Sequence, residues 1–150
     1  MKNFFQKAGG ILKDKNISIP ITSGMFSWML ESQTEKIESE GLYNIEVVFR
    51  DNHIRITGTA KKLLLKIPFS IVLTPSSAEK RIIKFDTGSM TPLNHDWIKK
   101  KIFNNPPYVN FENDLLHINL NGFEKVRAIP VGQILDFKIE DDKMWVRLGL

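Results

Sequence analysis

The chain contains no cysteine among its 150 residues, and this absence removes several classes of protein. A disulfide framework, a thiolate metal site and a cysteine nucleophile are all excluded. Only three histidines are present, and none stands four residues from another or within a His-Glu-x-x-His pattern. Because a zinc site needs about four ligands at defined spacing, the sequence predicts no metal and no cofactor.

Long hydrophobic runs are missing as well. No stretch approaches the roughly 18–20 apolar residues of a membrane-spanning helix. The first fifteen residues are interrupted by Lys7 and by the pair Gly9 and Gly10, unlike the apolar core of a signal peptide. We therefore expect no transmembrane span and no leader. A cytoplasmic location follows as the expectation, with association to a membrane surface left open.

Charge of one sign is scarce too. Lys and Arg number 21 against 17 Asp and Glu, which gives a formal net charge of +4. The basic residues are spread along the chain and are not interleaved with exposed aromatic residues, so nucleic-acid binding is not predicted. A content of 42% apolar residues in a chain of this length is typical of one folded domain spanning residues 1–150.

Catalytic motifs are absent from the sequence. Ser89 lies in a Gly-Ser-Met context without the second glycine of a nucleophile elbow. The triplet Asn94–Asp96 stands at an expected helix start, where consecutive side chains diverge and do not converge on one reacting atom. Glu140–Asp142 occupies an expected hairpin turn and lacks calcium-loop spacing. The sequence therefore predicts no catalytic residues and a protein that is not an enzyme.

Three segments carry helical patterns. Residues 1–15 form an amphipathic N-terminal segment, with a stripe for docking or membrane contact consisting of Phe4, Phe5, Ile11 and Leu12. We expect this stripe to dock on the protein or on a second subunit, because it is short and only partly flanked by lysine. A longer helix is expected over Gly24–Glu40 with Ser23 as its N-cap, and a shorter one from Pro92 to Phe103. Lys99–Lys101 is expected to be a solvated end of that shorter helix.

Period-two alternation dominates the rest of the chain, and residues 21–150 are expected to form a β-rich body. Hairpins are expected around residues 45–60, 108–120 and 134–148. The most regular alternation runs from Leu63 to Thr74 and predicts one long strand. Pro68 cannot donate a ladder hydrogen bond, so this strand is expected to have an edge or a bulge there. Thr74–Ser77 is expected to turn the chain into a returning strand over Arg81–Asp86.

The expected fold class is α+β: a long twisted antiparallel sheet with a long helix packed against it and one or two shorter helices. The long strand and the helix face together offer a large apolar lining, in which methionines add adaptable side chains. Such a lining either closes into a core or leaves a groove for an acyl chain. The candidate ligand-lining residues are Met25, Trp28, Met29, Leu65, Ile67, Phe69 and Ile71.

The order of elements resembles small bacterial members of the tubular lipid-binding (TULIP) superfamily, the LmeA-like family. The resemblance lies in ITSGMFSWML, FRDNHIRITGTA, LKIPFSIVLTP and IPVGQILDFKIEDDKMWVRLGL, and it spans Ile21–Leu150 in outline. This chain adds a hairpin-like piece over Tyr108–Val126. The resemblance implies a lipid-facing or membrane-facing binding module without catalysis, with a helix packed in a bent sheet.

Two functions remain as alternatives at this point. The leading one is a non-catalytic module that binds a hydrophobic ligand, a lipid or a membrane surface. The other is a protein-interaction or assembly module, including a homo-oligomer, that uses a long sheet edge for strand addition.

Overall fold

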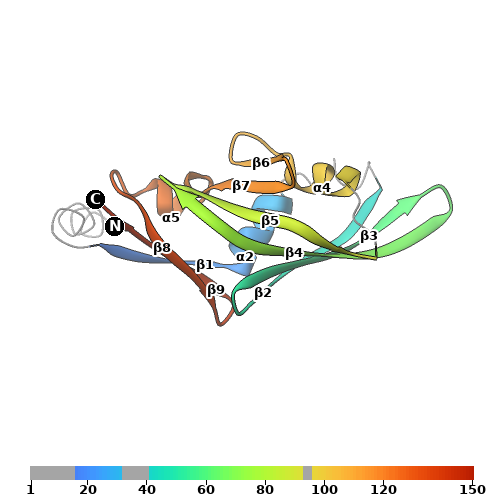
Figure 1. Ribbon diagram of the computed structural model, residues 1–150, viewed down its shortest axis with the longest axis horizontal. Helices are drawn as coiled ribbons and strands as arrows, with labels where there is room; N and C mark the ends of the chain where they lie inside the picture. Colours follow the sequence, from blue (N-terminus) through green and yellow to red (C-terminus); the bar gives the residue numbers. More distant parts are fainter. Residues whose placement is uncertain (1–15, 32–40, 93–95) are drawn as a thin grey trace.

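The computed structural model describes residues 16–31, 41–92 and 96–150 (Figure 1). Of these residues 61% lie in strands and 19% in helices. A three-stranded sheet has the order β1 (Ile17–Thr22), β9 (Lys143–Gly149), β8 (Gln133–Glu140). A six-stranded sheet has the order β2 (Leu42–Arg50), β3 (His53–Lys62), β4 (Leu65–Glu79), β5 (Ile82–Thr91), β7 (Leu115–Asn119), β6 (Val109–Glu112). The helices are α2 (Ser23–Glu31), α4 (Asp96–Phe103), the 3-10 turn η1 (Leu120–Gly122) and α5 (Glu124–Arg127).

The expected α+β class is therefore wrong: within the described ranges the fold is mostly β, and no long helix packs on a sheet. α2 is described over nine residues, and its expected continuation to Glu40 lies outside the described residues. Pro20 and Thr22, whose residue types favour a helix start, belong to β1. The Thr22 hydroxyl accepts a hydrogen bond from the Met25 N–H at 3.1 Å, so Thr22 is the N-cap in place of Ser23.

The strand expected over Leu63–Thr74 is real but displaced, since β4 covers 15 residues from Leu65 to Glu79. Leu63 lies instead in the β3–β4 turn, with φ of 59°. The turn expected at Thr74–Ser77 is wrong, because these residues stay within β4. Two register shifts in the β4–β5 ladder absorb the irregularity there. The turn at Leu63 was not predicted because apolar residues alternate through it without a break. The turn at Thr74–Ser77 was predicted because its residue types favour turns.

The expected edge at Pro68 is confirmed. The ladder between β4 and β5 begins at the pair Ser70 and Thr91, whereas β4 itself begins at Leu65. Within the described residues, β4 therefore has only β3 as a neighbour along Leu65–Phe69. A proline that cannot donate to a second neighbour costs nothing at such a position.

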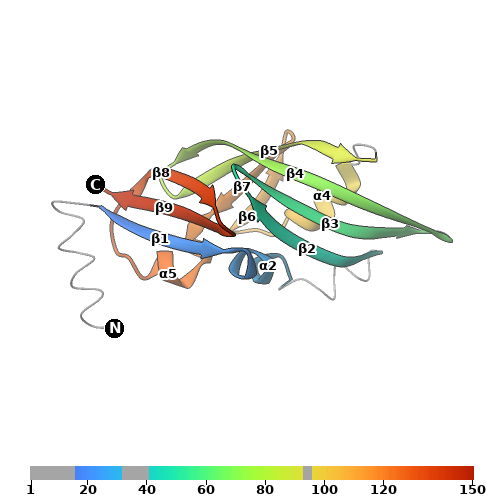
Figure 2. The same ribbon diagram turned by 90° about the horizontal axis from the view of Figure 1, so that it is seen from below.

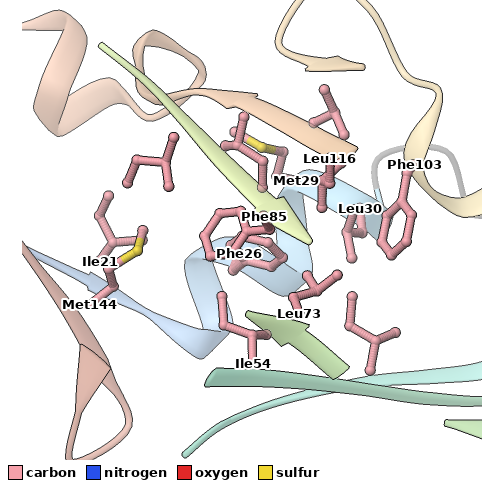
Figure 3. Packing of buried hydrophobic residues seen from close by; sticks show 14 of the residues in the cluster. Ile21, Phe26, Met29, Leu30, Ile54, Leu73, Phe85, Phe103, Leu116 and Met144 are labelled. Carbon is pink, nitrogen blue, oxygen red and sulfur yellow. The ribbon is translucent and has the colours of Figure 1, made fainter. Parts of the chain in front are cut away.

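One hydrophobic core joins the two sheets through α2 (Figure 3). Phe26 on α2 packs edge-on against Phe49 of β2, with ring centroids 5.8 Å apart. Ile21 and Met144 enter the core from the three-stranded sheet, and both are fully buried. The core-facing residues labelled around α2 in Figure 3 are Leu30, Ile54, Leu73, Phe85, Phe103 and Leu116.

The shorter helix α4 departs from expectation at one lysine. Lys100 and Lys101 are exposed, as a solvated helix end requires. Lys99 is instead completely buried, as are Ile98, Ile102 and Phe103 of the same helix. The helical period explains this correction, because Lys99 lies three and four residues before Ile102 and Phe103, on the face that packs inward.

Arg81, at the turn between β4 and β5, connects the six-stranded sheet to the segment that leads into β8. Its guanidinium donates to the Gly132, Val126 and Ile129 carbonyls at 2.9, 3.1 and 2.8 Å. A fourth hydrogen bond, 2.9 Å long, reaches the side-chain oxygen of Asn121. Burial lowers the pKa of Arg81 from its ordinary value. One side chain thus donates hydrogen bonds to four oxygen atoms of residues that lie outside the β-sheet ladders.

Replacing Arg81 with alanine is expected to lower the free energy of unfolding by about 2–4 kcal/mol, because several part-buried acceptors lose a charged donor. Chemical denaturation monitored by tryptophan fluorescence measures this loss. Arg55→Ala, which removes an exposed arginine from β3, is the matched control and is expected to change stability by about 0.5 kcal/mol or less. Equal losses in the two variants would contradict the connecting role of Arg81.

Candidate functional site

The structure separates the seven predicted lining residues into three places. Met29, Phe69 and Ile71 pack in the core with 5%, 3% and 0% of their surface exposed. Ile67 is half-buried on the same face of the hairpin as these core residues. At these positions the inner face of the β3–β4 hairpin and the α2 helix therefore belong to a closed core and leave no groove between them.

Met25 and Trp28 lie together at an open groove between α2 and α5. The groove has a volume of about 730 Å³ and is lined also by Phe123, Lys125 and Arg127. The Trp28 side chain is 64% exposed there. Only two of the seven predicted residues therefore share this groove, and no motif or periodicity in the sequence pointed to the α5 residues that complete it.

The predicted docking stripe of Phe4, Phe5, Ile11 and Leu12 lies outside the described residues. The last of the seven lining residues, Leu65, lies far from the groove. It is 65% exposed and belongs to the tip of the β3–β4 hairpin.

The hairpin tip, defined as Lys61–Lys66, protrudes beyond the six-stranded sheet. The β2–β3 ladder ends at the pair Leu42 and Ala60, and the β4–β5 ladder does not begin until Ser70. Lys61 still donates its backbone N–H to the Gly41 carbonyl at 2.7 Å. Within the described ranges, residues 62–66 are therefore a two-stranded ribbon with no further strand beside it. Figures 1 and 2 place this tip at one end of the long axis, with the C-terminus at the other.

Three consecutive leucines form the end of the tip. Leu63 and Leu64 are 88% and 96% exposed, more than any other large apolar side chain in the described part of the chain. With Leu65 they make a contiguous apolar surface on a narrow protrusion. Isolated exposed leucines are ordinary on protein surfaces, but an apolar cluster at a projecting end is typical of an interaction site.

The backbone conformation of the tip is also unusual for its sequence. Leu63 has φ of 59°, a left-handed conformation that glycine, asparagine and aspartate adopt most readily. Other hairpin turns of this chain place such residues in the left-handed region, namely Asn52, the pair Asn113 and Asp114, and the pair Asp141 and Asp142. The β4–β5 turn is a second exception, with Lys80 at φ of 56°. The tip differs from all these turns in placing a large apolar side chain in the left-handed conformation, and that side chain is almost fully exposed.

Lysines bracket the leucines on both faces of the hairpin. Lys61 and Lys66 are directly paired across the two strands, and Lys62 is paired with Leu65 on the opposite face. The Lys62 ammonium lies over the Trp97 ring, 5.6 Å from its centroid. The tip thus combines an apolar end with a positively charged collar, and none of its six residues carries a carboxylate.

A polar pocket lies behind the tip on the outer face of the hairpin. It has a volume of about 390 Å³ and is lined by Tyr43, Asn44, Thr59, Lys61 and Lys66. The pocket escaped prediction because its residues come from three strands, and because a register shift between Tyr43 and Glu46 sets their alignment. The signal in the sequence is the Lys-Lys-Leu-Leu-Leu-Lys run, of which the part from Leu63 onward falls within the expected long strand.

Other kinds of site find little support in the described part of the chain. No three histidine, aspartate or glutamate side chains are grouped so that they could hold a metal ion. None of the helices in the described ranges has the length and apolarity needed to cross a bilayer. Comparison with known proteins found no matching family model, no matching curated protein and no matching solved structure.

Substituting Leu63 with asparagine is expected to raise the free energy of unfolding by about 0.5–1 kcal/mol, since asparagine tolerates the left-handed conformation better. Urea denaturation of the purified variant measures the change. Ile71→Ala, in the buried part of the same hairpin, is the contrasting variant and should cost about 2–5 kcal/mol. If Leu63→Asn destabilised the protein comparably, Leu63 would be a packing residue and not a surface group.

Proposed function

We propose that this protein is a non-catalytic module that binds the surface of an anionic membrane through the tip of its β3–β4 hairpin. The observation that carries the proposal is the cluster of Leu63, Leu64 and Leu65, exposed at the end of a protruding ribbon and surrounded by lysine. The leucines enter the interfacial region of the bilayer. The lysines remain at the level of the negatively charged headgroups.

The energetics favour reversible binding. Burying a leucine side chain contributes roughly 1.5–3 kcal/mol, and each lysine near an anionic surface contributes about 1 kcal/mol. Either contribution alone gives marginal attachment, and stable attachment to a membrane generally takes two signals. The tip supplies both the apolar and the electrostatic signal within six residues. Attachment of this kind weakens as salt screens the lysines.

The shape of the tip favours a lipid surface over a protein partner. A stable protein interface buries about 800 Å² on each partner, which is far more than a two-residue turn and its flanking side chains provide. The two outer edges of the six-stranded sheet also suit strand addition poorly. The β2 edge carries a bulge between Tyr43 and Glu46, and the β6 edge strand has only four residues.

The resemblance to the tubular lipid-binding family stays a prediction, and membrane binding by the tip does not depend on it. Members of such a family would hold lipid inside a groove. The tip is instead a solvent-exposed end of the molecule, and its leucines are available to a bilayer whether or not the groove at Met25 and Trp28 takes a ligand.

The proposal is tested by flotation of the full chain with phosphatidylcholine vesicles that do or do not contain phosphatidylglycerol. We expect flotation with the anionic vesicles only, declining as salt is raised. Leu63→Ser combined with Leu64→Ser should weaken vesicle binding by at least about a hundredfold, because two apolar side chains no longer enter the bilayer. Unchanged binding of this double variant would contradict the proposal.

A second double variant controls for general surface hydrophobicity. Val131 and Leu150 are 47% and 69% exposed. Leu150 is the C-terminal residue, which lies at the other end of the molecule from the tip (Figure 1), and Gly132, next to Val131, lines the same pocket as Leu150. Changing both to serine is expected to leave flotation unchanged. Sedimentation velocity of the wild-type chain and both double variants tests the assembly alternative. That alternative would replace membrane binding if the wild-type chain floated with neither kind of vesicle and instead self-associated in a way that the Leu63 and Leu64 substitutions abolish.

A further inference from the structure

The polar pocket behind the tip has an arrangement that membrane attachment alone does not require. Lys61 and Lys66 are opposite one another in the β3–β4 ladder, so their side chains share one face. Like charges directly opposite each other in a sheet are destabilising. An anion between the two ammonium groups removes this repulsion and converts it into attraction.

The remaining lining groups complete a set of donors. Tyr43 and Thr59 are also paired across neighbouring strands, which puts their side chains on the same outer face as Lys61. Asn44 adds an amide at the register shift. Hydroxyl, amide and ammonium groups can all donate to the oxygens of one tetrahedral anion. Within the described part of the chain, none of these side chains forms a hydrogen bond or ion pair that would occupy it.

The charges around the pocket indicate which anion fits. Two ammonium groups balance a dianion, as in a phosphate monoester, better than the single charge of a phosphodiester. Glu46 is the nearest carboxylate along β2. It is paired with Thr57, which lies two residues further from the tip than the pocket residue Thr59. It therefore borders the pocket without lining it.

The position of the pocket matches the depth of a headgroup. Lys61 and Lys66 lie two residues from Leu63 and Leu64, which corresponds to roughly 7 Å along the strands. Interfacial apolar groups enter about 5–10 Å beyond the headgroup boundary. When the leucines are inserted, the pocket is therefore held at the level of the lipid phosphates.

We propose that the pocket lined by Tyr43, Asn44, Thr59, Lys61 and Lys66 binds the phosphate monoester of a lipid headgroup. This proposal rests on the membrane binding proposed above and gives it a lipid preference. A soluble phosphate presents the same chemistry. The lipid is favoured because the pocket adjoins the inserting leucines.

The experiment compares binding to vesicles that contain phosphatidate with binding to phosphatidylglycerol vesicles of matched surface charge. The wild-type chain should bind phosphatidate about tenfold more tightly, which is the effect of one well-placed charged hydrogen-bonding group. Lys61→Gln should abolish this preference. Lys62→Gln, its neighbour on the opposite face, should weaken binding to both vesicles about fivefold and leave the preference intact. Equal effects of the two variants on both lipids would overturn the proposal.

A second arm separates lipid from soluble phosphate. Inorganic phosphate and glycerol 3-phosphate are titrated into the free protein while the amide NMR signals of Thr59 and Lys61 are followed. Small chemical-shift changes that do not saturate support the lipid headgroup, provided that the same concentrations of phosphate leave the protein bound to phosphatidate vesicles. Saturation by inorganic phosphate without any phosphatidate preference would overturn that assignment in favour of a soluble ligand.

The two proposals fail differently. If Leu63→Ser with Leu64→Ser leaves vesicle binding unchanged, membrane insertion of the tip is wrong and the headgroup assignment falls with it. If that double variant loses binding but Lys61→Gln keeps the phosphatidate preference, the membrane proposal stands and the pocket assignment is wrong.

Discussion

The pairing of β3 with β4 is the interaction on which the rest of the molecule depends. The ladder runs without a shift from Ile54 and Leu73, deep in the core, to Lys62 and Leu65 at the tip. At its inner end the core faces of both strands are completely buried. At its outer end, from Lys62 to Leu65, no further strand of the described residues pairs with them. A two-stranded ribbon is only marginally stable alone, so the tip keeps its shape because the inner half of the ladder is fixed by the core.

Gly58 and Pro68 mark the transition between the buried inner half of the β3–β4 ladder and its exposed outer half. Gly58 is paired with Phe69, and a Cβ atom at Gly58 would meet the Phe69 ring at 2.8 Å and the Ile45 side chain at 2.7 Å. Glycine thus makes room for the last aromatic ring that covers the core before the hairpin leaves the sheet. Pro68 follows immediately on β4, where no second neighbouring strand among the described residues requires its missing N–H. Core packing ends at this level and surface chemistry begins.

Much of the strand content could be predicted from the sequence, because alternation and turn chemistry agree in several places. Asn113 and Asp114, and likewise Asp141 and Asp142, combine a turn preference with flanking apolar alternation, and both hairpins are confirmed. The pairing of β1 with β9 joins the two ends of the described chain and depends on tertiary packing that no local pattern encodes. Because Thr22 and Ser23 favour helix caps, the sequence indicated a helix start there and gave no sign of the strand β1 that precedes it.

The candidate site was harder to predict, for the same physical reason. Leu63 and Leu64 look like core residues because hydrophobicity alone does not distinguish a buried strand from an exposed turn. The decisive fact is the φ of 59° at Leu63, which contradicts the preference of leucine and is visible only in the structure. Leu65 was predicted as a lining residue, but as part of an internal surface and not of an exposed tip.

The bulge on β2 both protects the sheet edge and shapes the polar pocket behind the tip. An exposed edge strand invites pairing with another chain, and a register shift that leaves Asn44 at φ of 56° interrupts the regular row of donors and acceptors. The same shift leaves Tyr43 and Asn44 among the residues that line the pocket with Lys61 and Lys66. A regular strand would move the side chains beyond the bulge to the opposite face, since a shift of one residue exchanges the faces. The irregularity that makes β2 a poor template for strand addition is therefore also what places the Tyr43 hydroxyl and the Asn44 amide in one pocket with the two lysines.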